Sequence, residues 1–175
     1  LKHEIDTGGI IFQEKEPISE NDDAGSLYVR LMEKGARLVL KTVKAIEGGS
    51  HPNSPQPEAS ELKHAPKIFK ETCEINWTQT SRQVFNFVRG LSPYPGAWTT
   101  IGGKTYKIYR VTPPLPGQAQ HPTPSTQHPK PGSTNTDNST YLHISASDGW
   151  VAIEELQAEG KKKMGIRKFL MGNKI

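Results

Sequence analysis

The sequence contains very little cysteine and no long apolar run. Cys73 is the single cysteine among 175 residues, which excludes an internal disulfide and any metal site built from several thiolates. No apolar stretch approaches the roughly 20 residues that a transmembrane helix needs. Hydrophobic residues make up only 33% of the chain, and 16 Gly with 14 Pro indicate much irregular backbone. We therefore expect a cytoplasmic protein with no membrane segment, and not one large, uniformly packed domain.

Charge is distributed unevenly along the chain. Residues 1–48 hold 7 Lys and Arg against 9 Asp and Glu, whereas residues 67–175 hold 14 against 7, a net charge of +7 for that part. A basic segment of this kind indicates a polyanionic partner, although a solvated basic surface is also common.

The first part of the sequence predicts one strand and one helix. The apolar run at 10–12 follows Gly8-Gly9 and predicts a short strand. Apolar residues then recur at helical spacing between Leu27 and Ile46, and Gly48-Gly49 ends the pattern. A strand and a helix alone cannot bury their apolar faces. We therefore interpret 1–49 as the remnant of a larger α/β domain, and the absence of an initial Met also suggests a piece of a longer chain.

The middle and the last part of the sequence predict a linker and a small β domain. Residues 50–66 are rich in Pro and poor in apolar side chains, as in an interdomain linker. A helix follows, capped by Thr78 or Thr80, and then two hairpins around Gly102-Gly103 and Asp148-Gly149. The stretch 113–140 carries seven prolines and predicts a long mobile insertion. The fold class is thus α+β, with 67–175 as a small β-barrel of oligonucleotide-binding (OB) type behind one helix.

Several motifs together resemble the methionyl-tRNA formyltransferase family. Ile75-Asn76-Trp77-Thr78 precedes the helix, which ends in Arg89-Gly90-Leu91-Ser92-Pro93-Tyr94-Pro95-Gly96-Ala97-Trp98. Ile5-Asp6-Thr7-Gly8 is similar to the end of that family's catalytic domain. The stretches 27–36, 65–68 and 155–164 resemble the family as well, in matching order and spacing. The insertion at 113–140 is longer and richer in Pro than the family's usual connection.

The resemblance implies a reaction and its participants. In this family the amino group of initiator methionyl-tRNA attacks the formyl carbon of 10-formyltetrahydrofolate, and no metal is needed. Asp6 matches the Asp of the family's catalytic Asn, His and Asp, where it would orient the His and share in proton transfer. Taken alone, Asp6 would be read as an ordinary turn residue. Its two partners are absent from this sequence, so we expect the 175-residue chain by itself to be inactive, and we expect a monomer.

The resemblance also implies that the last part of the chain binds tRNA through basic residues. Phosphate contacts of this kind position an RNA and make its affinity depend on salt. The alternative for any single Lys is an ordinary solvated residue. The predicted tRNA-binding residues are Lys161, Lys162, Lys163, Arg167, Lys168, Lys104, Lys107, Arg110 and Arg89.

Other interpretations remain open from the sequence. Trp77, Tyr94 and Trp98 could stack on bases, but we expect all three to be core residues, because aromatic area dominates small cores. Related enzymes that formylate a nucleotide sugar or hydrolyse formyltetrahydrofolate resemble part of the chain, but give no reason for the dense basic run at 160–168. A non-enzymatic RNA-binding module is the third alternative.

Overall fold

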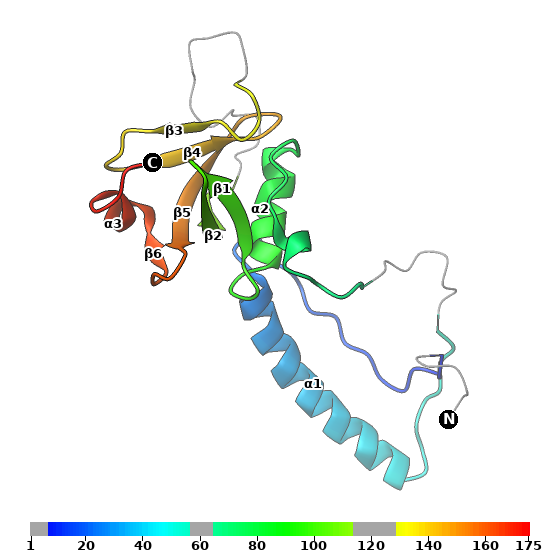
Figure 1. Ribbon diagram of the computed structural model, residues 1–175. Coiled ribbons are helices and arrows are strands. Elements are labelled where there is room, and N and C mark those ends of the chain that lie inside the picture. The colour runs from blue at the N-terminus through cyan, green and yellow to red at the C-terminus, as the bar shows by residue number, and fades with distance from the viewer. Residues whose placement is uncertain (1–6, 57–64, 114–128) are drawn as a thin grey trace. The chain divides into compact units, whose positions relative to one another are not determined.

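The computed structural model describes residues 7–56, 65–113 and 129–175 (Figure 1). The chain divides into two compact units, which we treat separately. The first unit comprises 1–19 and 26–67, and the second comprises 20–25 and 68–175. Within the described ranges, no helix has the length and apolar character needed to cross a membrane.

The first unit is organised around the helix α1, Ala24–Glu47. The predicted helical pattern is confirmed, and the helix ends where Gly49 adopts a φ of 69°. The predicted strand at 10–12 is wrong, because only Ile10 forms a ladder contact, an isolated antiparallel bridge to Ser54. This bridge also ties part of the predicted linker to the segment before α1, and Gln56 adds a hydrogen bond to the Gly8 carbonyl at 2.7 Å.

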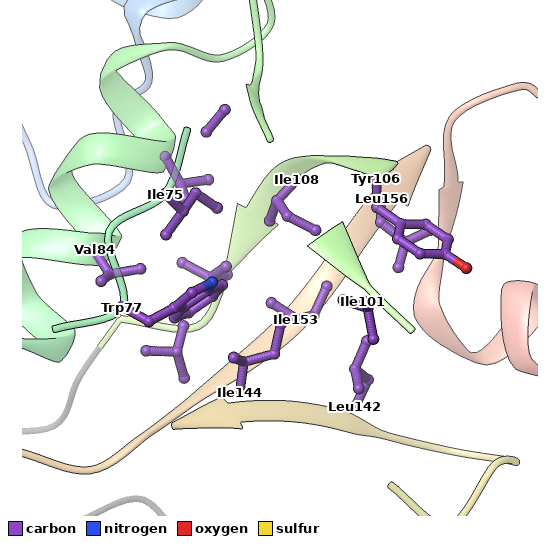
Figure 2. Packing of buried hydrophobic residues seen from close by; sticks show 14 of the residues in the cluster. Ile75, Trp77, Val84, Ile101, Tyr106, Ile108, Leu142, Ile144, Ile153 and Leu156 are labelled. Carbon is purple, nitrogen blue, oxygen red and sulfur yellow. The ribbon is translucent and has the colours of Figure 1, made fainter. Parts of the chain in front are cut away.

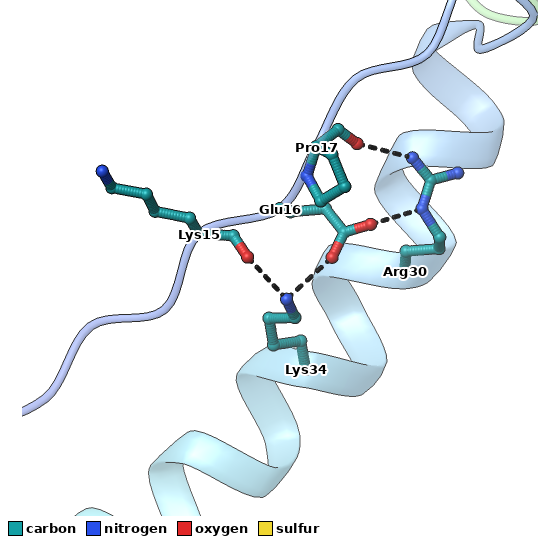
Figure 3. A network of polar contacts seen from close by, with 5 residues as sticks. All are labelled: Lys15, Glu16, Pro17, Arg30 and Lys34. Carbon is teal, nitrogen blue, oxygen red and sulfur yellow. Dashed lines mark hydrogen bonds and ion pairs between the residues drawn. The ribbon is translucent and has the colours of Figure 1, made fainter.

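Polar contacts hold the segment before α1 against the helix (Figure 3). The Glu16 carboxylate pairs with Arg30 Nε at 2.6 Å and with Lys34 Nζ at 2.8 Å. The same two cations also donate to backbone carbonyls, Arg30 to Pro17 at 3.2 Å and Lys34 to Lys15 at 2.7 Å. Hydrogen bonds from Lys34 and then from Arg30 hold the pKa of the Glu16 carboxyl below its ordinary value.

We expect Glu16→Gln to weaken the attachment of the segment before α1 to the helix at neutral pH. The variant should also lose the pH dependence of that attachment. The folded-state pKa of Glu16 is lowered, so its contribution is present above the unfolded-state pKa and is lost as pH falls through the folded-state value. Hydrogen exchange of the Ile10 and Ser54 amides, which donate to each other's carbonyls at 2.7 and 3.0 Å, measures this. Exchange protection should fall with acidification in the wild-type chain but not in the variant. Equal protection in both proteins at neutral pH would contradict the role of Glu16.

The described part of the second unit contains the short 3-10 helix η2, Glu71–Cys73, two α-helices and six strands in an antiparallel sheet. The helix α2, Ser81–Gly90, begins at a capping box, in which Gln83 N donates to Thr80 Oγ1 and Thr80 N donates to Gln83 Oε1. Of the two predicted caps, Thr80 is therefore the one used. The remaining elements are β1 Ala97–Ile101, β2 Lys104–Val111, β3 Thr134–Thr136, β4 Leu142–Ser145, β5 Trp150–Ala158, β6 Met164–Gly165 and the short helix α3 Ile166–Leu170.

The strands form a curled half-barrel (Figure 1). Their order is β1-β2-β5-β4-β3, and β6 pairs with β5. Both predicted hairpins are confirmed, with positive φ at Gly102 and Gly103 in the first. Within the insertion predicted at 113–140, residues 114–128 lie outside the described part. The prediction is wrong for its last portion, because β3 forms a ladder with β4 there.

The core lies between α2, the segment 73–77 and one face of the sheet (Figure 2). The helix contributes Val84, Phe85 and Val88, all buried. Trp77 closes one side, and its indole N–H donates to Thr99 Oγ1 at 2.9 Å. The strands supply further fully buried side chains, among them Ile108, Leu142, Ile144, Val151 and Leu156.

Candidate nucleic-acid interface

Strand β2 presents a buried face and an exposed face. Tyr106 and Ile108 point into the core, and Lys107 is exposed between them. The strand register places Lys107 opposite Trp98 of β1 on one side and Gln157 of β5 on the other. These side chains therefore form one row on the surface of the sheet that points away from the core. We call this surface the outer face, defined by Trp98, Lys107, Tyr109 and Gln157.

A register shift explains how Arg110 becomes exposed. Alternation would place Arg110 on the same face as the buried Ile108. The β2–β5 ladder is irregular between these two residues and again between Arg110 and Val111, so Arg110 stands opposite Glu155. Its side chain is 70% exposed and pairs with Glu154 at 2.8 Å. The bulge thus allows Arg110 to be exposed although Ile108 and Val111 remain buried.

The turn between β5 and β6 places the lysine run beside the outer face. Lys161 N donates to the Ala158 carbonyl at 3.0 Å, and Gln157 Nε2 donates to the Lys161 carbonyl at 2.6 Å. Lys163 pairs with Glu155 at 3.0 Å, and its ammonium lies 5.5 Å from the centre of the Tyr109 ring. Lys161, Lys162 and Lys163 are all exposed. The hairpin cation Lys107 and the lysine run are therefore neighbours across Gln157.

Arg89 holds the segment 20–25, which belongs to this unit, against the helix α2. Its guanidinium donates to the Asp22 carbonyl at 3.1 Å and to Asn86 Oδ1 at 2.9 Å, and it lies over the Phe85 ring. Arg82 forms an ion pair with Glu20 in the same region. Arg89 also lines a pocket of about 380 Å³ together with Arg110 and Lys163, but Glu20, Asp22, Asp23 and Glu155 line it as well. Four carboxylates against three cations make this pocket a poor phosphate site.

The remaining predicted cations lie elsewhere in the unit. Lys104 stands opposite Ile101 and shares the strand parity of the buried Tyr106. Arg167 and Lys168 are exposed on α3, whose Phe169 makes an edge-to-face contact with Tyr106 at 5.8 Å. The tail around them is a packed element, because Phe169 and Leu170 are buried. The structure therefore does not group Lys104, Arg167 and Lys168 with the outer face.

Tyr94 is the residue at which the aromatic prediction is wrong. Trp77 is buried in the core, and Trp98 is half-buried on the outer face, where it packs against the edge of the core cluster, but Tyr94 is 84% exposed. It lines a groove of about 550 Å³ on the outer face, together with Trp98, Lys107 and Gln157. One local signal for this exposure is the pair of flanking prolines at 93 and 95, which keep a short corner out of helix and strand.

The catalytic prediction lies outside the described residues. Asp6 belongs to the range 1–6, so its surroundings carry no structural argument. Within the described part of the chain, no group of three or more His, Cys, Asp or Glu side chains is arranged to hold a metal ion. Cys73 is buried there as a free thiol.

Comparison with known proteins places the chain in a family. Residues 67–174 match the model of the formyl transferase C-terminal domain. The methionyl-tRNA formyltransferase of Parabacteroides distasonis is 43% identical over 99% of this chain and 54% of its own length. That of Chlorobium phaeovibrioides is 38% identical over 98% of this chain and 51% of its own length. The chain thus spans about half the length of the curated relatives it matches.

Solved structures share the fold at lower identity. HypX from Aquifex aeolicus, in complex with tetrahydrofolic acid, superposes with a TM-score of 0.62 at 21% identity, covering 97% of this chain and 28% of HypX. WlaRD, a sugar 3N-formyl transferase, gives a TM-score of 0.59 at 22% identity, covering 93% of this chain and 53% of its own. The chain therefore belongs to the formyltransferase family, of which residues 67–174 are the C-terminal domain.

Proposed function

We propose that this chain is the C-terminal part of a methionyl-tRNA formyltransferase and that its second unit binds the tRNA. The observation that carries the proposal is the 43% identity to such an enzyme over 99% of the chain. The likeness to sugar formyltransferases is one of fold, at 22% identity, and does not favour their substrate. The curled sheet is consistent with the OB-like barrel that we predicted, a fold that often presents a surface to nucleic acid.

The outer face and the adjoining lysine run are the proposed contact surface. Lys107 and the exposed side chains of Lys161 and Lys162 make no ion pair with a described residue, so their charges are available to phosphates. Lys163 and Arg110 pair with Glu155 and Glu154, but both pairs are solvent-exposed and are therefore weak. A phosphate can replace either carboxylate at small cost. Lys104, Arg167 and Lys168 would contribute only if the RNA also reaches the neighbouring α3 surface.

The catalytic part of the proposal concerns Asp6 and the formyl donor. By resemblance to the family, Asp6 supplies one carboxylate that orients a histidine belonging to the half of the enzyme that this chain does not include. The donor, 10-formyltetrahydrofolate, is a substrate of the whole enzyme, and we assign it no contact with the described residues. The second unit would hold the tRNA so that its methionyl end reaches that site.

Titration of the chain with unacylated initiator tRNA at several salt concentrations tests the proposal. We expect the logarithm of the association constant to fall linearly with the logarithm of salt, with a slope of roughly 0.9 for each phosphate neutralised. The five cations of this surface, Lys107, Arg110 and the three lysines of the run, therefore predict a slope of roughly −4 to −5. Fluorescence anisotropy of labelled tRNA measures it. Absence of binding even at low salt would refute the proposed role of the second unit.

A further inference from the structure

The groove on the outer face has a floor from three strands and two walls from loops. Trp98, Lys107 and Gln157 form a row across β1, β2 and β5 on its floor. The segment 68–73 lies along one side and the corner 94–96 along another, and the volume is about 550 Å³. The Trp98 indole N–H donates to the Lys70 carbonyl at 2.8 Å, which fixes the first wall to the floor.

Exposed apolar area in the described part of the second unit is concentrated at this groove. Four large apolar side chains are exposed there, and three of them line the groove: Ile68 at 56%, Phe69 at 54% and Tyr94 at 84%. The fourth, Met171, is equally exposed at 84% but does not line it. Clustered aromatic exposure of this kind marks a binding surface, whereas single exposed residues do not.

The charges around the groove favour an anionic occupant. Lys70 and Lys107 line it, against one carboxylate, that of Glu159. Lys107 Nζ donates to the Pro95 carbonyl at 2.9 Å, so the ammonium is held beside the corner that carries Tyr94. Gly160 is also part of the lining, and the lysine run begins at the next residue. The groove therefore opens directly onto the proposed phosphate-binding surface.

The geometry also argues against an extended peptide as the occupant. A peptide that adds to a sheet needs a free strand edge. The outer edge of β1 is already used at this point, because Ile75 N donates to the Trp98 carbonyl at 2.8 Å. Aromatic rings next to lysines are instead the combination that holds a base by its face and the neighbouring phosphate by its charge.

We propose that this groove binds one unstacked nucleobase of the RNA, with Tyr94 as the stacking ring, Phe69 as an apolar wall, Trp98 as apolar floor, and Lys107 and Lys70 at the flanking phosphates. The proposal rests on the proposed function, since it names a subsite for the same RNA. A ring can stack on the face of any base, so the subsite discriminates between unpaired and paired nucleotides but not between base sequences.

The test compares Tyr94→Ala with Tyr94→Phe, which keeps the ring, and with Met171→Ala, which removes an equally exposed apolar side chain outside the groove. The probes are a single-stranded oligouridylate and the same strand annealed to oligoadenylate, titrated into the full chain at several salt concentrations. We expect Tyr94→Ala to weaken single-strand binding about tenfold. The salt slope should stay unchanged, because no phosphate contact is lost. Tyr94→Phe and Met171→Ala should bind like the wild-type chain, and the duplex should bind equally to all four proteins.

The outcomes separate this proposal from the proposed function. Suppose that charge reversal in the lysine run weakens RNA binding while Tyr94→Ala binds as Met171→Ala does. The second unit then binds RNA without a base in the groove, and the subsite proposal is overturned. Equal losses for single strand and duplex would also overturn it, because a paired base cannot enter the groove. Failure of the wild-type chain to bind any RNA would overturn both proposals.

Discussion

Replacing Lys161, Lys162 and Lys163 together with Glu should weaken the binding of unacylated initiator tRNA on the order of a hundredfold or more near 0.1 M salt. All three side chains are exposed on the turn beside the outer face. Each lost phosphate contact forfeits the release of about one counterion, so the salt slope should also become shallower by roughly 2 to 3. The fold should survive, since the ion pair of Lys163 with Glu155 that this change removes is solvent-exposed and therefore weak.

The matched control reverses three charges in the first unit. Lys15, Arg37 and Lys44 are exposed there, and their replacement by Glu changes the net charge by the same amount. If overall charge alone steers the tRNA, both triple variants should lose affinity equally. A specific surface predicts a large loss only for the lysine run. Anisotropy titrations of both variants at two salt concentrations decide between these results. Equal losses of tRNA affinity would show that the lysine run is not the contact.

Truncating Leu156 to Ala should destabilise the second unit by about 2–5 kcal/mol. Leu156 lies in β5, the strand that pairs with β2, β4 and β6, and its side chain has no exposed area. Neighbours from several strands surround it, so they cannot close the cavity by a local shift. A loss of this size is a large fraction of the stability of a domain of this length.

Tryptophan fluorescence during urea unfolding reports on this change selectively. The three tryptophans of the chain, at positions 77, 98 and 150, all belong to the second unit. The first unit therefore does not contribute to the signal through tryptophan. Leu40→Ala is the control, because Leu40 is 57% exposed on α1. We expect the midpoint to fall for Leu156→Ala and to stay in place for Leu40→Ala; an unchanged midpoint for Leu156→Ala would show that β5 does not limit the stability of this unit.

Local sequence signals predicted most of the regular elements. The helix α2 follows from an apolar stripe and a Thr-x-x-Gln capping box, both of which act within a few residues. The hairpin between β1 and β2 follows from Gly102-Gly103, because glycine accepts the positive φ that a tight turn needs. The helix α1 follows from spacing alone. Its apolar residues nevertheless remain exposed, for instance Val39 at 64% and Tyr28 at 67%.

Features that depend on partners distant in sequence were not predicted. The strand at 10–12 fails because a strand needs a neighbour, and only Ser54 provides a single bridge. The strand β3 forms within a Pro-rich stretch because β4 offers it a free edge. The tail after the lysine run folds as β6 and α3 because Phe169 packs against Tyr106, which lies more than 60 residues earlier in the sequence. None of these partnerships leaves a local signature.

For the candidate site, too, the residue types could be predicted from the sequence, but their positions relative to one another could not. The sequence indicated which cations belong to a basic C-terminal unit, and its motifs indicated the family, which the comparisons confirmed. It did not indicate that Lys107 and the lysine run share a face while Lys104, Arg167 and Lys168 do not, or that Tyr94 is exposed. Residue type and short-range spacing determine helices, turns and charge, because these depend on atoms a few bonds apart. Strand register, the bulge beside Arg110 and the packing of α3 decide which side chains meet, because they depend on contacts that form only when distant segments come together.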